Sequence, residues 1–187
     1  QPVRDLSFFL KRLRTLDHLP ELESSHTAMS STWDRSGGNL DGWDFKRVER
    51  EEGQAGGRNI LLDVEGPGCI HRIFTGWLGQ GKDILGKLGP AGTRIQFFFD
   101  GAEQPLFDMP VERFFDDRGE GPFPYPLVFH KTYPGILFPI PFARHCRVQL
   151  YNSDEPAWGN FWQITYTTYA PETPVKSLSW PLTSPEA

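Results

Sequence analysis

The sequence lacks the features that mark several protein classes. It has two cysteines in 187 residues, too few for a disulfide-built scaffold. No stretch approaches the roughly 18 consecutive apolar residues of a membrane helix. Acidic residues outnumber basic ones, 24 to 19, and the formal net charge is -5, whereas a nucleic-acid binder needs a basic surface against the phosphates. We therefore expect neither nucleic acid nor a membrane as a partner.

Motifs for the commonest catalytic chemistries are also missing from the sequence. It contains no G-x-S-x-G nucleophile elbow, no P-loop and no dinucleotide fingerprint. The five histidines are not spaced as metal ligands, and His71, beside Arg72, is the one we single out as an exception. We expect no cofactor and no metal.

Glycine, proline and aromatic residues are abundant instead. The chain has 19 glycines, 17 prolines and 14% aromatic residues, which favours short strands joined by turns. One amphipathic helix is predicted over Leu6–Leu19, followed by a polar loop from Glu21 to Ser31. Nine strands are predicted: Phe45–Val48, Asn59–Glu65, Cys69–Trp77, Thr93–Asp100, Leu106–Met109, Leu127–His130, Ile136–Ile140, Arg147–Tyr151 and Phe161–Tyr169.

This pattern predicts an all-β fold, a single antiparallel jelly-roll sandwich with one N-terminal helix. The expected organisation is an N-terminal helix and loop over residues 1–29, a jelly roll over 30–170, and a Pro-rich arm or linker over 171–187. Cys69 and Cys146 each lie in an apolar stretch. Two buried thiols and one disulfide are both compatible with that placement.

One loop combines side chains suited to binding sugars. Between Ser30 and Trp43, two indoles flank carboxylates, an amide and a guanidinium. Aromatic rings stack on the apolar faces of sugars, and the polar groups hydrogen-bond to hydroxyls. The alternative is a surface loop whose polar side chains only cap its own turns. The candidate substrate-binding residues are Trp33, Asp34, Arg35, Asn39, Asp41 and Trp43.

Four motifs in order along residues 30–170 resemble glycoside hydrolase family 172. The first is a Ser-Ser-x-Asp-Arg-x-Gly-Gly-Asn-like segment, in which Thr32 and Leu40 look like insertions. The second is a Gly-Pro-Gly turn at 66–68, and the third is a Phe-Asp-Gly hairpin at 99–101 followed by Pro-x-x-x-Phe-Phe at 110–115. The fourth is Ile-Pro-Phe at 140–142. The resemblance implies a subunit with two jelly rolls that processes fructofuranosides or arabinofuranosides by a retaining mechanism with two glutamates. It also implies ring-like oligomers with sites near subunit contacts.

The resemblance places the catalytic glutamates in a second jelly roll, around a Gly-Thr-x-x-Glu-Asp-Tyr-like segment that this sequence lacks. A retaining pair needs two carboxyls about 5 Å apart, and no matched pair is evident among the glutamates in turn or charged contexts, which are Glu49, Glu51, Glu52, Glu65, Glu103, Glu112, Glu120 and Glu155. The catalytic residues are therefore unknown at this point. We expect a carbohydrate ligand, and a homo-oligomer or a hetero-oligomer with a second jelly roll.

Two other functions remain compatible with the sequence. A single jelly roll can be a capsid-like or fibre-like assembly subunit, and the edge-like Ile136–Phe142 segment would suit an interface. A carbohydrate-binding module without catalysis is the third reading. The chain starts at Gln1 and not at Met, and export is slightly favoured over a cytoplasmic location.

Overall fold

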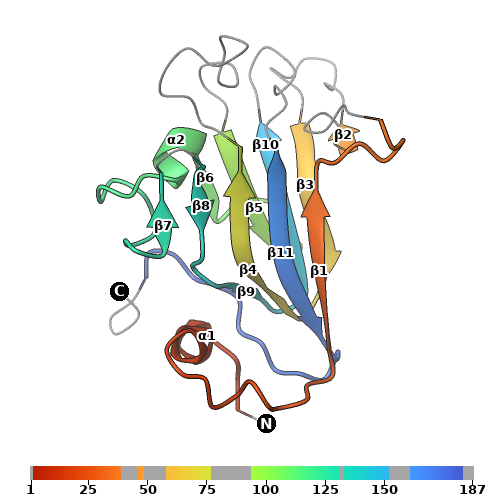
Figure 1. Cartoon of the computed structure of the whole chain (residues 1–187), viewed down its shortest axis with the longest axis vertical. Coiled ribbons are helices and arrows are strands. Elements are labelled where there is room, and N and C mark those ends of the chain that lie inside the picture. Colours follow the sequence, from red (N-terminus) through yellow and green to blue (C-terminus); the bar gives the residue numbers. More distant parts are fainter. Residues whose placement is uncertain are drawn as a thin grey trace.

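The computed structural model describes residues 2–38, 46–48, 58–76, 94–130, 133–151 and 161–182, with the backbone alone for 46–48. These residues form two antiparallel sheets that face each other across one core (Figure 1). The predicted all-β antiparallel sandwich with an N-terminal helix is thereby confirmed. The short helix α1 lies beneath one end of the sandwich, and the second helix, α2, lies at the other (Figure 1).

The first sheet follows the order β1-β11-β4-β8-β7, with β9 also paired to β4. Its strands are β1 (Ser25–Ser31), β4 (Gly68–Thr75), β7 (Val128–Phe129), β8 (Gly135–Ile136), β9 (Ile140–Phe142) and β11 (Trp162–Tyr169). The segment predicted as one strand over Ile136–Ile140 is divided into β8 and β9. Pro139, which cannot donate to a ladder, lies between the two.

The second sheet has the order β2-β3-β10-β5-β6. Its strands are β2 (Lys46–Val48), β3 (Arg58–Glu65), β5 (Arg94–Phe99), β6 (Phe107–Pro110) and β10 (His145–Tyr151). The central strand β10 pairs with β3 on one side and with β5 on the other, and its register against β3 shifts between Val148 and Gln149.

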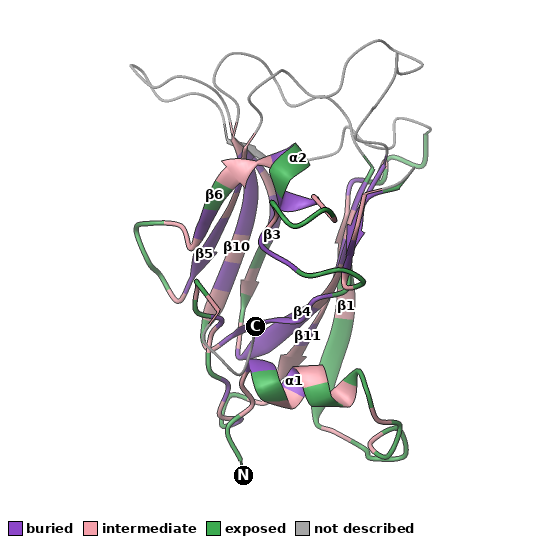
Figure 2. Cartoon of the chain, turned by 90° about the vertical axis from the view of Figure 1, so that its left-hand side faces the viewer, coloured by how far each residue is buried: buried purple, intermediate pink, exposed green. Residues whose placement is uncertain are grey.

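Aromatic side chains dominate the core between the sheets. Phe97 from β5 stacks on Phe114 from α2 (Val111–Phe114) at 5.2 Å between ring centroids, and Phe107 meets both rings edge-on. The purple strands in Figure 2 show that this buried surface lies between the layers. Each buried Phe removes a large apolar area from water, so this cluster is the main stabilising contact between α2 and the sandwich.

The N-terminal helix is shorter than the sequence predicts. Helix α1 covers Leu6–Arg12, and the Asp5 side chain caps it by accepting a hydrogen bond from the backbone N–H of Phe8 at 3.0 Å. Leu6 and Phe9 are buried, whereas Leu13 and Leu16 are exposed. The apolar spacing continues past Arg12 without a surface to bury it, and a short helix needs such packing to persist. The prediction of a helix to Leu19 was therefore wrong.

Strand β1 is the second correction, because the sequence predicts a loop over Glu21–Ser31. Seven residues of β1, from Ser25 to Ser31, pair with β11. Among the described strands β1 lies at the edge of its sheet, and most of its side chains are exposed. A strand held mainly by ladder hydrogen bonds needs no apolar alternation, which explains why hydrophobic periodicity missed it.

Tight turns close the end of the sandwich near α1. Gly66–Pro67 joins β3 to β4. The connection from β5 to β6 covers residues 100–106 and begins with a tight turn at Asp100–Gly101, where φ is 58° and 82° and the backbone N–H of Ala102 donates to the carbonyl of Phe99. At the opposite end lie the last residues of β1, β4 and β10 and the first residues of β3, β5 and β11. The segment after β11 returns along the sandwich and buries Val175 and Leu178.

Candidate functional site

The candidate sugar-binding residues begin immediately after β1, at the end opposite to the tight turns. Thr32 fixes the start of this segment to the sheet: its backbone N–H donates to the carbonyl of Trp162, and its Oγ1 accepts from the backbone N–H of Trp162 at 3.0 Å. Trp162 and Thr32 are both buried. The residues that follow are therefore carried by a rigid part of the core.

Trp33 and Arg35 form an exposed pair on this support. The Trp33 side chain is 53% exposed, and the Arg35 guanidinium carbon lies 5.3 Å from the centre of its ring. Arg35 also donates from Nη2 to the carbonyl of Ser31 at 2.9 Å and from Nη1 to the carbonyl of Trp33 at 3.2 Å. These contacts hold the guanidinium over one face of an exposed indole, and the two groups together offer a ring surface and hydrogen-bond donors to a sugar.

Asp34 has a clear local role. Its Oδ1 accepts from the backbone N–H of Ser36 at 2.9 Å and from the Ser36 hydroxyl at 2.6 Å, which is an Asx-type turn. A Cβ at Gly38 would lie 2.6 Å from Asp34 Oδ2, so glycine permits this close approach. The side chain is partly exposed, and the self-capping loop considered as the alternative therefore describes part of what Asp34 does.

The other three candidates, Asn39, Asp41 and Trp43, lie outside the described residues. The structure therefore brings together Trp33, Asp34 and Arg35 of the predicted set. The role of all six in binding a substrate stays a prediction.

Phe161 is an aromatic residue at the same end that the sequence analysis did not single out. Trp33 follows Thr32, and Phe161 precedes Trp162, the partner of Thr32 in the antiparallel pair β1–β11. The two aromatic residues thus extend from neighbouring strands at one end, and Phe161 is 55% exposed. A lone Phe at the start of a predicted strand gives no sign of this position, which depends on the β1–β11 register.

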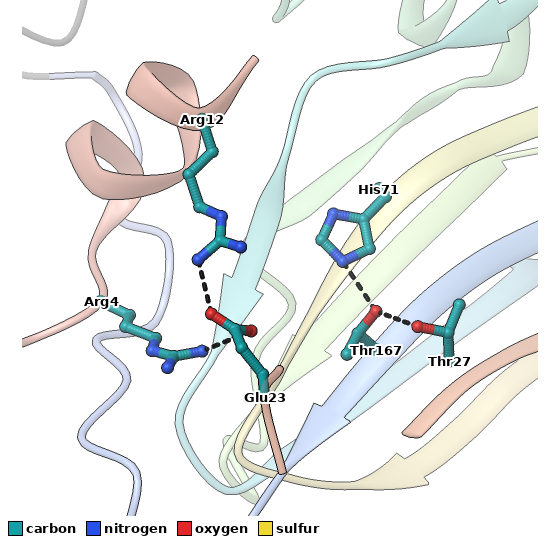
Figure 3. A network of polar contacts seen from close by, with 6 residues as sticks. All are labelled: Arg4, Arg12, Glu23, Thr27, His71 and Thr167. Atoms are coloured by element: carbon teal, nitrogen blue, oxygen red, sulfur yellow. Dashed lines mark hydrogen bonds and ion pairs between the residues drawn. The ribbon is translucent and has the colours of Figure 1, made fainter. Parts of the chain in front are cut away.

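A second group of polar side chains surrounds a cavity of about 270 Å³ between α1 and the outer face of the first sheet. Glu23 lies beside two arginines: its Oε1 is 2.6 Å from Nη1 of Arg12, and its Oε2 is 3.3 Å from Nη1 of Arg4 (Figure 3). The Arg4 guanidinium lies over the ring of Tyr169 at 4.6 Å. The cavity is lined by Phe9, Arg12, Leu13, His18, Glu23, Ser25, Thr27, His71, Leu137, Pro139, Thr167 and Tyr169.

A chain of polar contacts crosses the floor of this cavity. His71 Nε2 lies 3.0 Å from Thr167 Oγ1, which lies 2.8 Å from Thr27 Oγ1 (Figure 3). Burial, and then the positive charge of Arg12, lower the pKa of His71, so its imidazole is neutral at pH 7. Burial raises the pKa of Tyr169. The sequence drew attention to His71 alone, because no short-range spacing links it to Arg4, Arg12 or Glu23.

Other reactive groups of the described residues are placed as follows. Cys69 and Cys146 are free, buried thiols whose pKa values are raised by burial. Of the two alternatives that the sequence allowed, two thiols or one disulfide, the structure has the two thiols.

In the described segments no three or more His, Cys, Asp or Glu side chains gather as a metal site would require. No helix in these segments is long and apolar enough to span a membrane.

The described glutamates are distributed over both ends of the sandwich. Glu65 ends β3, and Glu103 lies in the β5–β6 hairpin, both at the tight-turn end, whereas Glu112 is in α2 at the other end. All three are exposed. Glu23 alone lies in the cavity, between two arginines. Two glutamates acting on one glycosidic bond would have to lie about 5 Å apart, and Glu112 lies at the opposite end of the sandwich from Glu65 and Glu103.

Comparison with known proteins agrees with this architecture. A family model described as "GH172 first beta-sandwich domain" matches residues 23–184. No curated protein matches the chain. The matched segment begins at Glu23 and continues beyond β11, and so includes both sheets and the loop that carries Trp33. The chain belongs to glycoside hydrolase family 172, as its first β-sandwich domain.

Proposed function

We propose that this sandwich is the substrate-binding first domain of a retaining, furanoside-processing glycoside hydrolase, acting on fructofuranosides or arabinofuranosides. The observation that carries the proposal is the exposed Trp33 ring with the Arg35 guanidinium over one of its faces, held to the core through Thr32 and Trp162. The family match supplies the glycosidase context. The choice of furanosides follows from the resemblance in the ordered motifs.

The proposed division of labour follows from the chemistry of each side chain. Trp33, or Trp43, offers a ring for the apolar face of the sugar, and Phe161 adds a second aromatic surface at that end. Arg35 donates to sugar oxygens. Asp34, Asn39 and Asp41 bind hydroxyl groups.

The two catalytic glutamates are proposed to come from a second jelly roll or from a partner chain. Retention requires a nucleophile and an acid/base about 5 Å apart. Of the described glutamates, Glu112 lies at the opposite end of the sandwich from Glu65 and Glu103, and the matching model is that of a first sandwich. In this proposal the present chain binds and orients the sugar but does not cleave it alone.

Titration with furanosides tests the binding role. Methyl furanosides of D-arabinose and fructose-containing disaccharides are added to the chain, and binding is followed by saturation-transfer NMR and calorimetry. We expect Trp33→Ala to weaken binding about fivefold or more, since stacked rings contribute about 1 kcal/mol or more. Tyr125→Ala is the control, because Tyr125 is 73% exposed in the connection between α2 and β7. Equal binding by the wild type and Trp33→Ala would sink the assignment.

Two substitutions at Asp34 separate its turn from its proposed ligand contact. Asp34→Asn keeps the oxygen that accepts from Ser36 but removes the charge, whereas Asp34→Ala removes both. If the carboxylate binds sugar, both variants lose affinity. If Asp34 only shapes the turn, Asp34→Asn binds as the wild type does, and that result removes Asp34 from the proposed site.

A second candidate function is that of an assembly subunit, alone as a homo-oligomer or with a second jelly roll. Leucines from Leu13 to Leu22 are exposed after α1, and β1 is the edge of its sheet among the described strands. An exposed edge beside apolar side chains is suited to association. Light scattering tests it: a strictly monomeric chain at high concentration would rule out the homo-oligomer, and Leu16→Glu should dissociate one that forms through this surface.

A further inference from the structure

We infer that the cavity between α1 and the first sheet is a second ligand site, and that it takes one neutral, polyhydroxylated molecule of single-ring size, such as a monosaccharide or a cyclic polyol. It lies near α1, at the opposite end of the sandwich from Trp33. The inference goes beyond the proposed function and does not depend on it.

The size of the cavity suits a small ligand. Its volume is about 270 Å³, just below the range of roughly 300–1,000 Å³ that holds drug-sized ligands. Phe9, Leu137 and Tyr169 supply apolar surface in the lining, against which the C–H face of a ring can pack. A single ring therefore fits better than an oligosaccharide.

The charges in the cavity favour a neutral ligand. The lining has one positive group, Arg12, and one negative group, Glu23, and these are already paired at 2.6 Å. A bound anion would have to compete with Glu23 for Arg12, and a cation would approach a carboxylate already flanked by Arg4 and Arg12. A molecule without charge avoids both conflicts.

The polar groups of the cavity match hydroxyls, which donate and accept at the same atom. Thr27 and Thr167 are joined by a contact in which either hydroxyl can donate, and the neutral His71 ring offers one donor and one acceptor. The imidazole of His18 also belongs to the lining.

A matched pair of threonine variants tests the site. Thr167→Val removes the hydroxyl that contacts His71 with little change of shape, and Thr168→Val makes the same change at the next residue, which points to the opposite face of β11. D-arabinose, D-fructose, myo-inositol and inorganic phosphate are titrated while the ring resonances of His71 are recorded. We expect at least one of the three polyols to shift these resonances, with roughly tenfold weaker binding in Thr167→Val.

The remaining outcomes either support or overturn the inference. Unchanged affinity in Thr168→Val and in Trp33→Ala supports a separate site, and loss in Trp33→Ala alone places the ligand at the loop instead. No shift of His71 with any of the polyols at tens of millimolar overturns the site, and a shift with phosphate alone overturns the ligand class. The wild-type titration decides between these outcomes even if Thr167→Val fails to fold.

Discussion

The two ends of the sandwich differ in how their backbones are held. At the tight-turn end, tight turns and buried contacts close the fold: Asp100 receives backbone hydrogen bonds from Arg144 and His145, and Gly68 lies against the ring of Phe142. At the other end, Trp33 and Phe161 are exposed beyond a buried pair, Thr32 and Trp162.

This difference indicates at which end substitutions should leave the stability of the fold unchanged. Residues at the tight-turn end hold strands together, so their loss should lower the free energy of unfolding. The exposed side chains beyond β1 at the opposite end are attached to the core but are not part of it. Their removal should therefore alter binding and leave the free energy of unfolding nearly unchanged.

Asp100→Ala should give the largest loss of stability. It removes the acceptor for two backbone N–H groups and for the Ser177 hydroxyl, and it places alanine at φ 58°. The free energy of unfolding should fall by about 3 kcal/mol, measured by urea denaturation. Asp100→Asn, which keeps an acceptor and tolerates this φ, should lose clearly less. Equal losses would show that the charge matters and the turn geometry does not.

Glu23→Ala tests the ion pairs that Glu23 forms with Arg4 and Arg12. It leaves the partly buried guanidinium groups of Arg4 and Arg12 without their carboxylate. The free energy of unfolding should fall by about 2 kcal/mol, again measured by urea denaturation. Glu21→Ala is the control, because Glu21 is exposed and close in sequence. A loss for Glu23→Ala no larger than that of the control would mean that these ion pairs do not help to hold α1.

Lower pH should weaken the same end through His71. The pKa of this buried imidazole is lowered in the folded state, so the unfolded chain binds the proton more readily. Stability is therefore complete above the unfolded value of about 6.5 and is lost as the pH falls from there through the folded pKa. His71→Gln should show a smaller loss between pH 7 and pH 5 than the wild type, whereas the exposed His26→Gln should match the wild type.

Trp33→Ala should have the smallest effect on stability. Its ring is 53% exposed, and its partner Arg35 keeps its hydrogen bond to Ser31. The change in the free energy of unfolding should stay within about 0.5 kcal/mol, measured by thermal and urea denaturation. A decrease in the free energy of unfolding of more than 1 kcal/mol would mean that Trp33 stabilises this end of the sandwich, and the two ends would then not differ as described.

The sequence was most informative where local chemistry decides the structure. The Gly-Pro-Gly turn at 66–68, the Asp100–Gly101 hairpin and the strands with buried alternate residues are all found. The helix was predicted too long because apolar spacing continues into exposed leucines. Strand β1 was missed because its pairing with β11, more than 130 residues away, leaves no local pattern.

The candidate sites show the same division. Trp33, Asp34 and Arg35 are close in sequence, and their side-chain chemistry could be recognised there. The proximity of Phe161 to this segment, and of Arg12 and Glu23 to His71, depends on strand register and on the packing of α1. Only the folded chain brings these residues together.

The central claim is that this sandwich binds a furanoside at the Trp33 end and leaves the cleavage to other residues. It is tested most directly by one NMR titration of the chain with a methyl D-arabinofuranoside and a fructofuranosyl disaccharide, in which the Trp33 indole N–H is assigned by Trp33→Ala. We expect one of these sugars to shift this resonance and to stay uncleaved during prolonged incubation. An unperturbed Trp33 with both sugars, or hydrolysis by this chain alone, would contradict the account.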